Sequence, residues 1–453
     1  MTVTDHITTV DPIPHGFEMT LDVDAVRIDR HAILGGHPSR VFRLSDPGAH
    51  TLDKLIEGPV HTAEGARLAR RLSDAGVLHP TPPTAAAPTL TIVIPVFDGA
   101  GQLEACLHSL GQTFPVIVVD DGSRDPGALQ RVCNWHAAHL IRRRTNGGPA
   151  AARTTGLLAC TSDVVVLIDS DCLPTPVAIN HLAAHLADPL VAAVAPRMTA
   201  SGSRSVLDLG DRPALVCRGG RVSYLPTAVL AVRRSALTQV DGFDPMLRVG
   251  EDVDLVWRLI DAGWRVRYDP SVTVRHDEPS GVLGRARRRF RYGTSAGPLE
   301  LRHPGRLRHL HLSQRTLPVA AAAAAGSPGL VGVALVMSAA QLVQHSRHAG
   351  VPTEQAAHHA VRDTAEVWTA LGTWCSQLAT PLLALALLRG GRRRRIVTAA
   401  LLVAPAFRAR SLTIITDNIA YGAGVWTGCL RAHTTGPLRV PIVHPPRTDR
   451  AQS

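Results

Sequence analysis

The sequence is almost devoid of lysine and poor in aromatic residues. Lys54 is the only lysine among its 48 Lys and Arg residues, which outnumber 37 acidic residues and give a net charge of +11. Aromatic residues make up 4% of the 453 positions. Proteins that bind single-stranded nucleic acid stack bases on aromatic side chains. We therefore expect no nucleic-acid partner, despite the positive charge.

Paired cysteine motifs are also absent, because no two of the seven cysteines have the CxxC spacing. We expect reduced, scattered thiols and neither a disulfide framework nor a zinc cluster. The first residues lack the basic start and apolar stretch of a secretory signal, which predicts a cytoplasmic catalytic body. The hydrophobic share of 45% and the charged share of 19% exclude wholesale disorder. The cysteines are Cys106, Cys133, Cys160, Cys172, Cys217, Cys375 and Cys429.

Changes in composition along the chain predict five segments. A small mixed module precedes a Pro/Ala linker, and an α/β domain, an apolar helical region and a flexible tail follow. The predicted bounds are 20–80, 81–88, 89–298, 299–435 and 436–453.

The α/β domain is predicted from apolar strands that alternate with helices. The runs LTIVIPV (90–96), PVIVVDDGS (115–123) and DVVVLIDSD (163–171) are typical of strands covered on both faces. Helical stretches at about 101–111 and 127–139 separate them, which predicts parallel pairing through right-handed crossovers. Ligands of such sheets bind at the carboxyl ends of the strands. The GxGxxG fingerprint of dinucleotide-binding folds is absent.

Carboxylates stand at two of these strand ends. Asp120 and Asp121 end one strand, and Asp169 and Asp171 end another. Asp169 and Asp171 are two residues apart, so both side chains point to one side of an extended chain. Two oxygen ligands in that arrangement suit Mg²⁺ or Mn²⁺. The alternative is a pair of strand-capping turns, in which aspartate is common.

Two further motifs join polar side chains to helix starts. NGGPAAARTTG (146–156) places free N–H groups and Arg153 near a helix N-terminus, where an anion can bind. GEDVDLVWRL (250–259) carries Glu251 and Asp252 in the first turn of a helix, and a carboxylate there can act as a general base. The alternatives are an ordinary connection and compensation of the helix dipole.

His276 and an arginine run complete the set of candidates. His276 follows an apolar segment and can offer an imidazole to the same metal, or it can be one of 22 histidines on a loop. The run RARRRFRYG (285–293) contains Arg289 and Tyr292. Arginine there can stabilise a diphosphate leaving group, although a solvated surface is the usual reason for such a run.

Taken together, these motifs resemble those of the family 2 glycosyltransferases over about residues 89–295. The resemblance implies a GT-A fold and inverting transfer from a nucleotide-sugar, with a divalent metal on its diphosphate. It rests on IPV (94–96), VVDDGS (118–123), NGGPAAARTTG, IDSD (168–171), DGFDP (241–245) and GEDVDL (250–255).

The resemblance also implies roles for single residues. Pro95, Asp120, Asp121, Arg153 and Asp169 are expected to bind the nucleotide-sugar. Asp169, Asp171 and His276 are the expected metal ligands, and Asp252 is the expected catalytic base. Glu251, Arg289 and Tyr292 are expected near the acceptor. One departure is FDG (97–99), where the family often has tyrosine and asparagine.

The whole layout is similar to that of the mycofactocin-system glycosyltransferases. That similarity implies transfer of glucose from UDP-glucose onto a peptide-derived redox cofactor, to build a β-linked oligoglucose. The N-terminal module is similar to winged-helix peptide-recognition domains. Peptide recognition, structural packing and DNA contact are the open alternatives for it.

The composition of the C-terminal third favours association with a membrane. The stretches 317–343 and 368–388 carry no charge, and the second ends at RGGRRRR (389–395). One exit and one return would leave the catalytic domain and this basic run in the cytosol. Buried or interfacial helices of a peripheral protein are the alternative.

Three other functions remain open. One is a rhamnosyl-, mannosyl- or galactosyltransferase that acts on envelope lipid or polysaccharide. A second is a membrane assembly factor that keeps the fold without activity. The third, a basic DNA- or RNA-binding protein, is disfavoured by the intact aspartate set and the scarcity of lysine.

Overall fold

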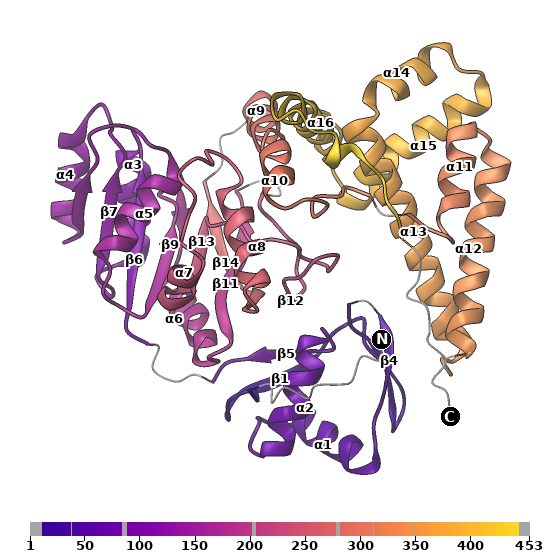
Figure 1. The fold of residues 1–453 in the computed structure, drawn as a ribbon, viewed down its shortest axis with the longest axis horizontal. Helices are drawn as coiled ribbons and strands as arrows, with labels where there is room; N and C mark the ends of the chain where they lie inside the picture. The colour runs from indigo at the N-terminus through magenta and orange to yellow at the C-terminus, as the bar shows by residue number, and fades with distance from the viewer. Residues whose placement is uncertain are drawn as a thin grey trace. The chain divides into compact units, whose positions relative to one another are not determined.

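The computed structural model describes residues 11–37, 39–83, 88–201, 205–277, 281–310, 312–348 and 350–443. The chain forms two compact units, 1–278 and 279–453. Figure 1 shows its helices and strands in chain order. The domain bounds expected from the sequence stay a prediction, while helices α9 and α10 belong to the second unit.

A small module begins the first unit. Strands β2, β3 and β4 form an antiparallel meander, and β1 pairs with β5 on the far side of two helices. Both helices are capped, because Ser45 and Thr62 accept hydrogen bonds from backbone N–H groups of the first turn. The elements are β1 (Glu18–Leu21), β2 (Val26–Asp29), β3 (Ala32–Gly35), β4 (Arg40–Arg43), α1 (Asp46–Glu57), α2 (Ala63–Asp74) and β5 (Leu78–Thr81).

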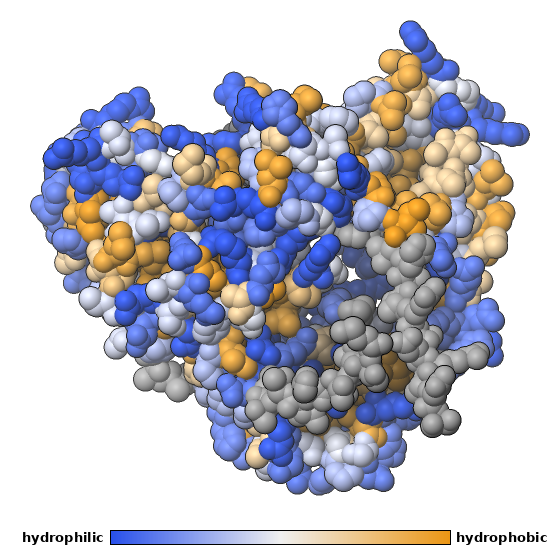
Figure 2. Space-filling model, in the orientation of Figure 1, coloured by the Kyte–Doolittle hydropathy of each residue, from blue (hydrophilic) through white to orange (hydrophobic). Residues whose placement is uncertain are grey.

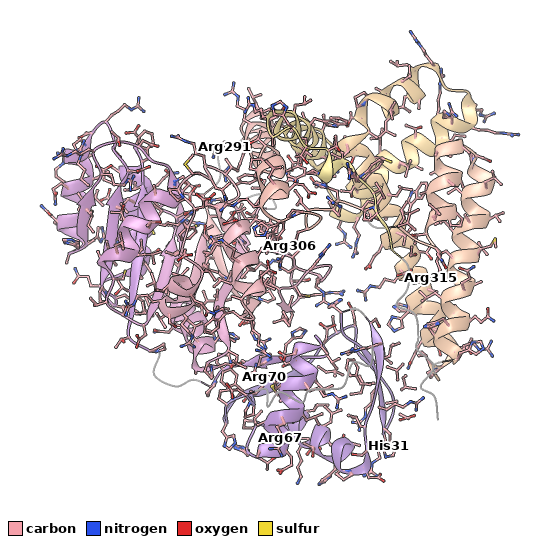
Figure 3. All side chains as sticks on the ribbon, in the orientation of Figure 1. His31, Arg67, Arg70, Arg291, Arg306 and Arg315 are labelled. Carbon is pink, nitrogen blue, oxygen red and sulfur yellow. The ribbon has the colours of Figure 1, made fainter. Side chains whose placement is uncertain are left out.

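Helix α2 docks this module onto the rest of the first unit. Arg70 on α2 is 2.6 Å from Asp188, and both side chains are almost fully buried (Figure 3). Asp74, also on α2, is 2.6 Å from Arg265. A buried ion pair is costly to break because it leaves an unpaired charge behind. The contacts support a packing role for the module, and peptide recognition stays a prediction.

A mixed nine-stranded sheet forms the core of the first unit, with strand order β10-β14-β11-β13-β9-β6-β7-β8 and β12 beside β14. The expected α/β core of GT-A-like layout is confirmed. Its strands are β6 (Leu90–Val96), β7 (Val116–Asp120), β8 (His139–Arg142), β9 (Val164–Ile168), β10 (Cys172–Leu173), β11 (Val191–Thr199), β12 (Ala214–Leu215), β13 (Val229–Arg233) and β14 (Arg265–His276). Its helices are α3 (Ala100–Leu110), α4 (Pro126–Trp135), α5 (Pro149–Ala159), α6 (Pro176–Ala184), η1 (His185–Ala187), α7 (Arg234–Gln239) and α8 (Glu251–Asp261).

The expectation of parallel pairing holds for only part of this sheet. Strands β8, β7, β6 and β9 are parallel neighbours, as the alternating pattern predicts. Strand β13 is antiparallel to both β9 and β11. Helix periodicity between strands does not predict this reversal, because the described residues between β11 and β13 form no crossover helix. Helix α4 also ends at Trp135, earlier than expected, and Ala137 then takes a left-handed conformation.

Both faces of the parallel strands are covered, which explains their unbroken apolar runs. On one face, Ile92, Ile94 and Val118 join a core with α3, α4 and α6. On the other face, Gly156 of α5 lies against Val93 and Val119. These layers place the carboxyl ends of β6, β7 and β9 at one edge of the sheet.

The second unit is mainly helical. Helix α9 packs closely on α16, because Gly293 faces the carbonyl of Tyr421 and Gly424 faces that of Phe290. Figure 2 shows hydrophobic patches over the helices of this unit. Its elements are α9 (Val282–Gly293), α10 (Ala296–Arg302), β15 (Leu312–Ser313), α11 (Leu317–Ala325), α12 (Pro328–His348), α13 (Thr353–Leu378), α14 (Thr380–Arg389), α15 (Arg392–Ala409), α16 (Thr413–Arg431), η2 (Gly436–Leu438) and β16 (Ile442–Val443).

Among the described residues, α12 is the one helix long and apolar enough to cross a membrane. The number rises to three if each of two bent pairs is one span: α13 with α14, bent by 96°, and α15 with α16, bent by 111°. Neither apolar stretch expected from the sequence is a single helix. Gly326 divides 317–343 with a φ of 70°, and Pro381 follows the break in 368–388, where its ring prevents a continuous helix.

We predict that Gly156→Ala destabilises the first unit. The added methyl group would lie 3.2 Å from Val119 Cγ2 and still closer to Val93 Cγ1. Overpacking of this kind costs about 1–3 kcal/mol. Thermal unfolding followed by tryptophan fluorescence should show a lower melting temperature. Gly101→Ala in α3 is the matched control, because its methyl group meets nothing within 4 Å; equal melting temperatures for the two variants would contradict the close packing.

Candidate active site

The turn after β7 is held by its own aspartates. Asp120 is fully buried, and its Oδ1 accepts a hydrogen bond from the Ser123 N–H at 2.8 Å. Its Oδ2 has no hydrogen-bond partner among the described residues and lies 3.8 Å from Arg142 Nε. One carboxylate oxygen of Asp120 therefore accepts no hydrogen bond from the described residues.

Asp121 fixes the glycine turn that precedes α5. Its two oxygens accept hydrogen bonds from the N–H groups of Gly147 and Gly148 at 3.0 and 2.7 Å. Arg143 Nε also lies 2.8 Å from the same carboxylate. Gly148, the residue before α5, has a φ of 88°, a conformation that favours glycine. The N–H groups predicted to face an anion thus already bind an anion of the protein itself.

Asp98 is a site residue to which sequence reasoning gave no role. It has a φ of 53° at the turn after β6, and its carboxylate accepts hydrogen bonds from the N–H and Nε of Arg124 at 2.8 and 2.7 Å. The Asp98 N–H donates to Ser123 Oγ at 2.9 Å. This clasp joins the ends of β6 and β7 and lowers the pKa of Asp98. In the sequence, the departure from the family pattern at FDG (97–99) is a signal that could have drawn attention to Asp98.

Arg153 connects the two acidic motifs. It is buried on α5 and donates from Nη1 to Glu251 at 2.8 Å and from Nη2 to Asp169 at 2.6 Å. Its guanidinium also lies over the ring of Phe243, 5.7 Å from the centroid. Burial alone would lower the pKa of Arg153, but Asp169 and Glu251 raise it above its usual value. Arg153 is therefore a permanent cation between the strand end and the start of α8.

Asp252 stands next to this ion-pair network. It is the second residue of α8, is only partly exposed, and accepts a hydrogen bond from the Val253 N–H at 2.8 Å. Burial, followed by the negative charge of Glu251, raises its pKa to about 7. A carboxyl group with this pKa can accept a proton near neutral pH and retain enough basicity to be useful.

The predicted metal ligands only partly come together. Asp171 Oδ2 lies 3.2 Å from His276 Nε2, and Cys172 brings its sulfur within 4.8 Å of donor atoms on both. Antiparallel pairing of β10 with β14 sets this contact, because Cys172 is opposite His276. Burial raises the pKa of Cys172 well above its usual value, which disfavours a thiolate ligand. Asp169 instead binds Arg153.

This arrangement fits a divalent metal with oxygen and nitrogen ligands. Asp171 and His276 offer a carboxylate and an imidazole side by side, and the carboxylate is a ligand that suits Mg²⁺ and Mn²⁺. The side chains of Asp169 and Asp171 keep about a third and a quarter of their surfaces exposed. The site is thus open to solvent at the edge of the sheet.

The remaining predicted residues belong to β6 and α9. Pro95 is in β6, paired in register with Val119 of β7. Arg289 and Tyr292 belong to α9 of the second unit, where the Arg289 guanidinium lies 4.9 Å from the ring centroid of Tyr421. Arg291 is on the same helix (Figure 3). Their roles near an acceptor stay predictions.

Arg258 attaches the DGFDP motif (241–245) to helix α8. This α8 residue binds Asp254 at 2.8 Å and donates to the carbonyl oxygens of Val240 and Gly242. The segment that carries Phe243 is thereby attached to the helix that carries Asp252. Sequence reasoning quoted the motif but gave Phe243 and Arg258 no role.

Comparison with known proteins finds related sequences. The family model "Glycosyl transferase family 2" matches residues 91–237. A pre-mycofactocin glycosyltransferase of Mycobacterium tuberculosis is 36% identical over 478 aligned residues, which cover 96% of this chain and 99% of the relative. An N-acetylglucosaminyltransferase of Rhizobium meliloti is 29% identical over 46% of this chain and 55% of its own length.

Among solved structures, a mannosyltransferase from Pyrobaculum calidifontis, in complex with GDP-Man and Mn²⁺, aligns with a TM-score of 0.45 and 21% identity over 76% of this chain and 89% of its own. The pre-mycofactocin glycosyltransferase of Mycobacterium tuberculosis matches this chain along nearly its entire length, and this match shows the family. The chain therefore belongs to the family 2 glycosyltransferases, and it is a glycosyltransferase.

Proposed function

We propose that the protein transfers glucose from UDP-glucose, with inversion, onto a precursor of the redox cofactor mycofactocin. The observation that carries the chemistry is the Arg153 network, which brings the IDSD and GEDVDL motifs together beside a carboxyl group with a pKa of about 7. The 36% identity to a pre-mycofactocin glycosyltransferase supports the acceptor and, through it, the glucose donor.

Each group then has a task in one displacement. Asp252 removes the proton from the acceptor hydroxyl as that oxygen attacks the anomeric carbon, and the bond from this carbon to the diphosphate breaks. Arg153 stays bound to Asp169 and Glu251 and holds the reacting edge in place. Asp120 Oδ2 accepts no hydrogen bond among the described residues, which supports the proposed contact of Asp120 with the nucleotide.

A divalent metal is part of the proposal. Asp171 and His276, with Asp169 close by in the chain, would hold Mg²⁺ or Mn²⁺, which when bound neutralises negative charge on the diphosphate leaving group.

We further propose that the second unit associates with the membrane while the first lies in the cytosol, where nucleotide-sugars are made. Helix α12 is long and apolar enough to span, and the side chains of Val333, Val336 and Met337 on it are 58%, 69% and 58% exposed. Several exposed apolar side chains on one helix favour a lipid environment. Four arginines start α15 and suit the cytosolic surface.

Donor and metal are tested together. Purified protein is assayed with UDP-glucose, GDP-mannose and dTDP-rhamnose, with the peptide-derived acceptor and either Mn²⁺ or Mg²⁺. We expect turnover with UDP-glucose, loss of turnover with EDTA, and a large loss in Asp171→Ala. Asp163→Ala, which removes an exposed carboxylate at the other end of β9, should keep activity. Turnover with another donor alone would overturn the sugar and leave the enzyme class intact.

The base assignment predicts a pH dependence. Because the base must be ionised and the pKa of Asp252 is about 7 in the protein without substrate, kcat/KM should rise from pH 6 to pH 8 and then level off. Asp252→Asn should lower kcat by about 10²–10⁴-fold and remove this rise. Asp261→Asn, at the exposed end of the same helix, is the control. An unchanged profile in Asp252→Asn would assign the base elsewhere.

Membrane association predicts retention in the membrane fraction after a high-salt wash. Val336→Asp on α12 should reduce retention, because a carboxylate in the centre of a span costs about 2.5–3.5 kcal/mol. Val361→Asp on α13 is the control, because Val361 is as exposed, at 70%, but lies next to the charged residues Arg362 and Asp363. Release of the unmodified protein by salt alone would show a peripheral attachment.

A further inference from the structure

A second cluster of side chains that can bind a metal lies within the first unit, away from Asp169 and Asp171 at the end of β9. His181 is on α6, and His185 follows four residues later as this helix continues into η1. Residues four apart on a helix project from the same side. Asp269 faces them from β14, so three potential ligands come from two separate elements.

The donor atoms converge on one point. His181 Nε2 and His185 Nε2 each lie 2.8 Å from the same oxygen of Asp269, Oδ2. The other oxygen, Oδ1, accepts hydrogen bonds from the N–H and hydroxyl of Ser271 at 2.9 and 2.6 Å. Ser271 thus fixes the carboxylate and leaves Oδ2 directed at the two imidazoles.

One carboxylate serves both imidazoles of this cluster. Burial alone would raise the pKa of Asp269, but hydrogen bonds from His181, His185 and Ser271 outweigh it and keep the pKa low. Arg267 on β14 donates to Ser73 Oγ, and its positive charge acts on His185 and opposes a cation there. The case for a metal therefore rests on the convergence of the three donor atoms.

We propose that His181, His185 and Asp269 form a binding site for a zinc-class transition metal, distinct from the metal site proposed for the sugar donor. Zinc bonds to nitrogen and oxygen are about 2.0–2.2 Å long, so tetrahedral ligand atoms stand about 3.4 Å apart. The three donor atoms already lie within 4.8 Å of one another, and side-chain rotations that lengthen the two 2.8 Å contacts to this spacing would complete the site.

The ligand set and its exposure define the kind of site. Two imidazoles and one carboxylate select zinc over Mg²⁺, which prefers oxygen. The fourth position is left to water, and His181, with 29% of its side chain exposed, gives access from solvent. Asp269 precedes His276 on β14 by seven residues, which is about 20 Å along a strand, so the two sites do not share an ion.

The ion would connect α6 to an irregular part of the sheet. Pairing of β11 with β14 shifts register between Pro196 and Arg197, whose partners are Asp269 and Thr273. The strand therefore bulges directly after Asp269, where ladder hydrogen bonds are interrupted. Metal bonds at this position replace stabilisation that the bulge removes.

The test measures zinc itself. Full-length protein is freed of metal by a chelator and titrated with Zn²⁺ against a chromophoric zinc indicator, in an Asp171→Ala background that weakens the donor site. We expect one bound zinc, and an affinity lower by more than tenfold after His181→Ala or the isosteric Asp269→Asn. Co²⁺ in place of zinc should give the visible absorption of a tetrahedral site, and both variants should lose it.

Two controls separate this site from chance binding and from misfolding. His31→Ala removes an exposed histidine (Figure 3) whose Nε2 is 2.8 Å from Asp46. This His–Asp pair has no third potential ligand among the residues that the structure describes, so the change should leave zinc binding unchanged. Circular dichroism and Mg²⁺-supported activity of His181→Ala in the otherwise native chain establish that the variant is folded. Equal zinc stoichiometry and affinity in all variants would overturn the proposal and leave a hydrogen-bonded clamp; this outcome is independent of the sugar-transfer assay.

Discussion

A buried guanidinium requires partners, and the active edge of this protein is arranged around that requirement. Arg153 has only 3% of its surface exposed, and its two terminal nitrogens donate to Asp169 and Glu251. These carboxylates come from a strand end and a helix start 82 residues apart (251 minus 169). Removing one of them would leave one terminal nitrogen of this buried cation without its partner. The same two carboxylates raise the pKa of Asp252, so the partners of Arg153 also help to set the basicity of Asp252.

Much of the architecture could be predicted from local patterns. The apolar runs at 115–123 and 163–171 contain strands covered on both faces, and the aspartates at their carboxyl ends lie at one edge, as parallel strands require. The antiparallel strand β13 could not be predicted, since its direction depends on a long connection without periodicity. The family was also correctly identified from motif order, because several short motifs in sequence are far more specific than any one of them.

Side-chain partners were harder to predict, because they depend on contacts between distant segments. Arg153 was expected to face an anionic ligand, and its partners are carboxylates of the protein. His276 was expected near the metal ligands, and strand pairing does place it beside Asp171. The histidines of α6 gave no signal, because their spacing becomes meaningful only when β14 brings Asp269 opposite them.

The hydrogen bonds from the 147–148 turn to Asp121 have a consequence for each catalytic cycle. A mobile loop that closes over a substrate loses about 1–2 kcal/mol of conformational entropy for every backbone residue it orders. Here that ordering takes place once, during folding, and does not recur at each turnover. A ligand that contacts this turn would meet a preorganised surface and would not have to order the backbone of the turn on binding.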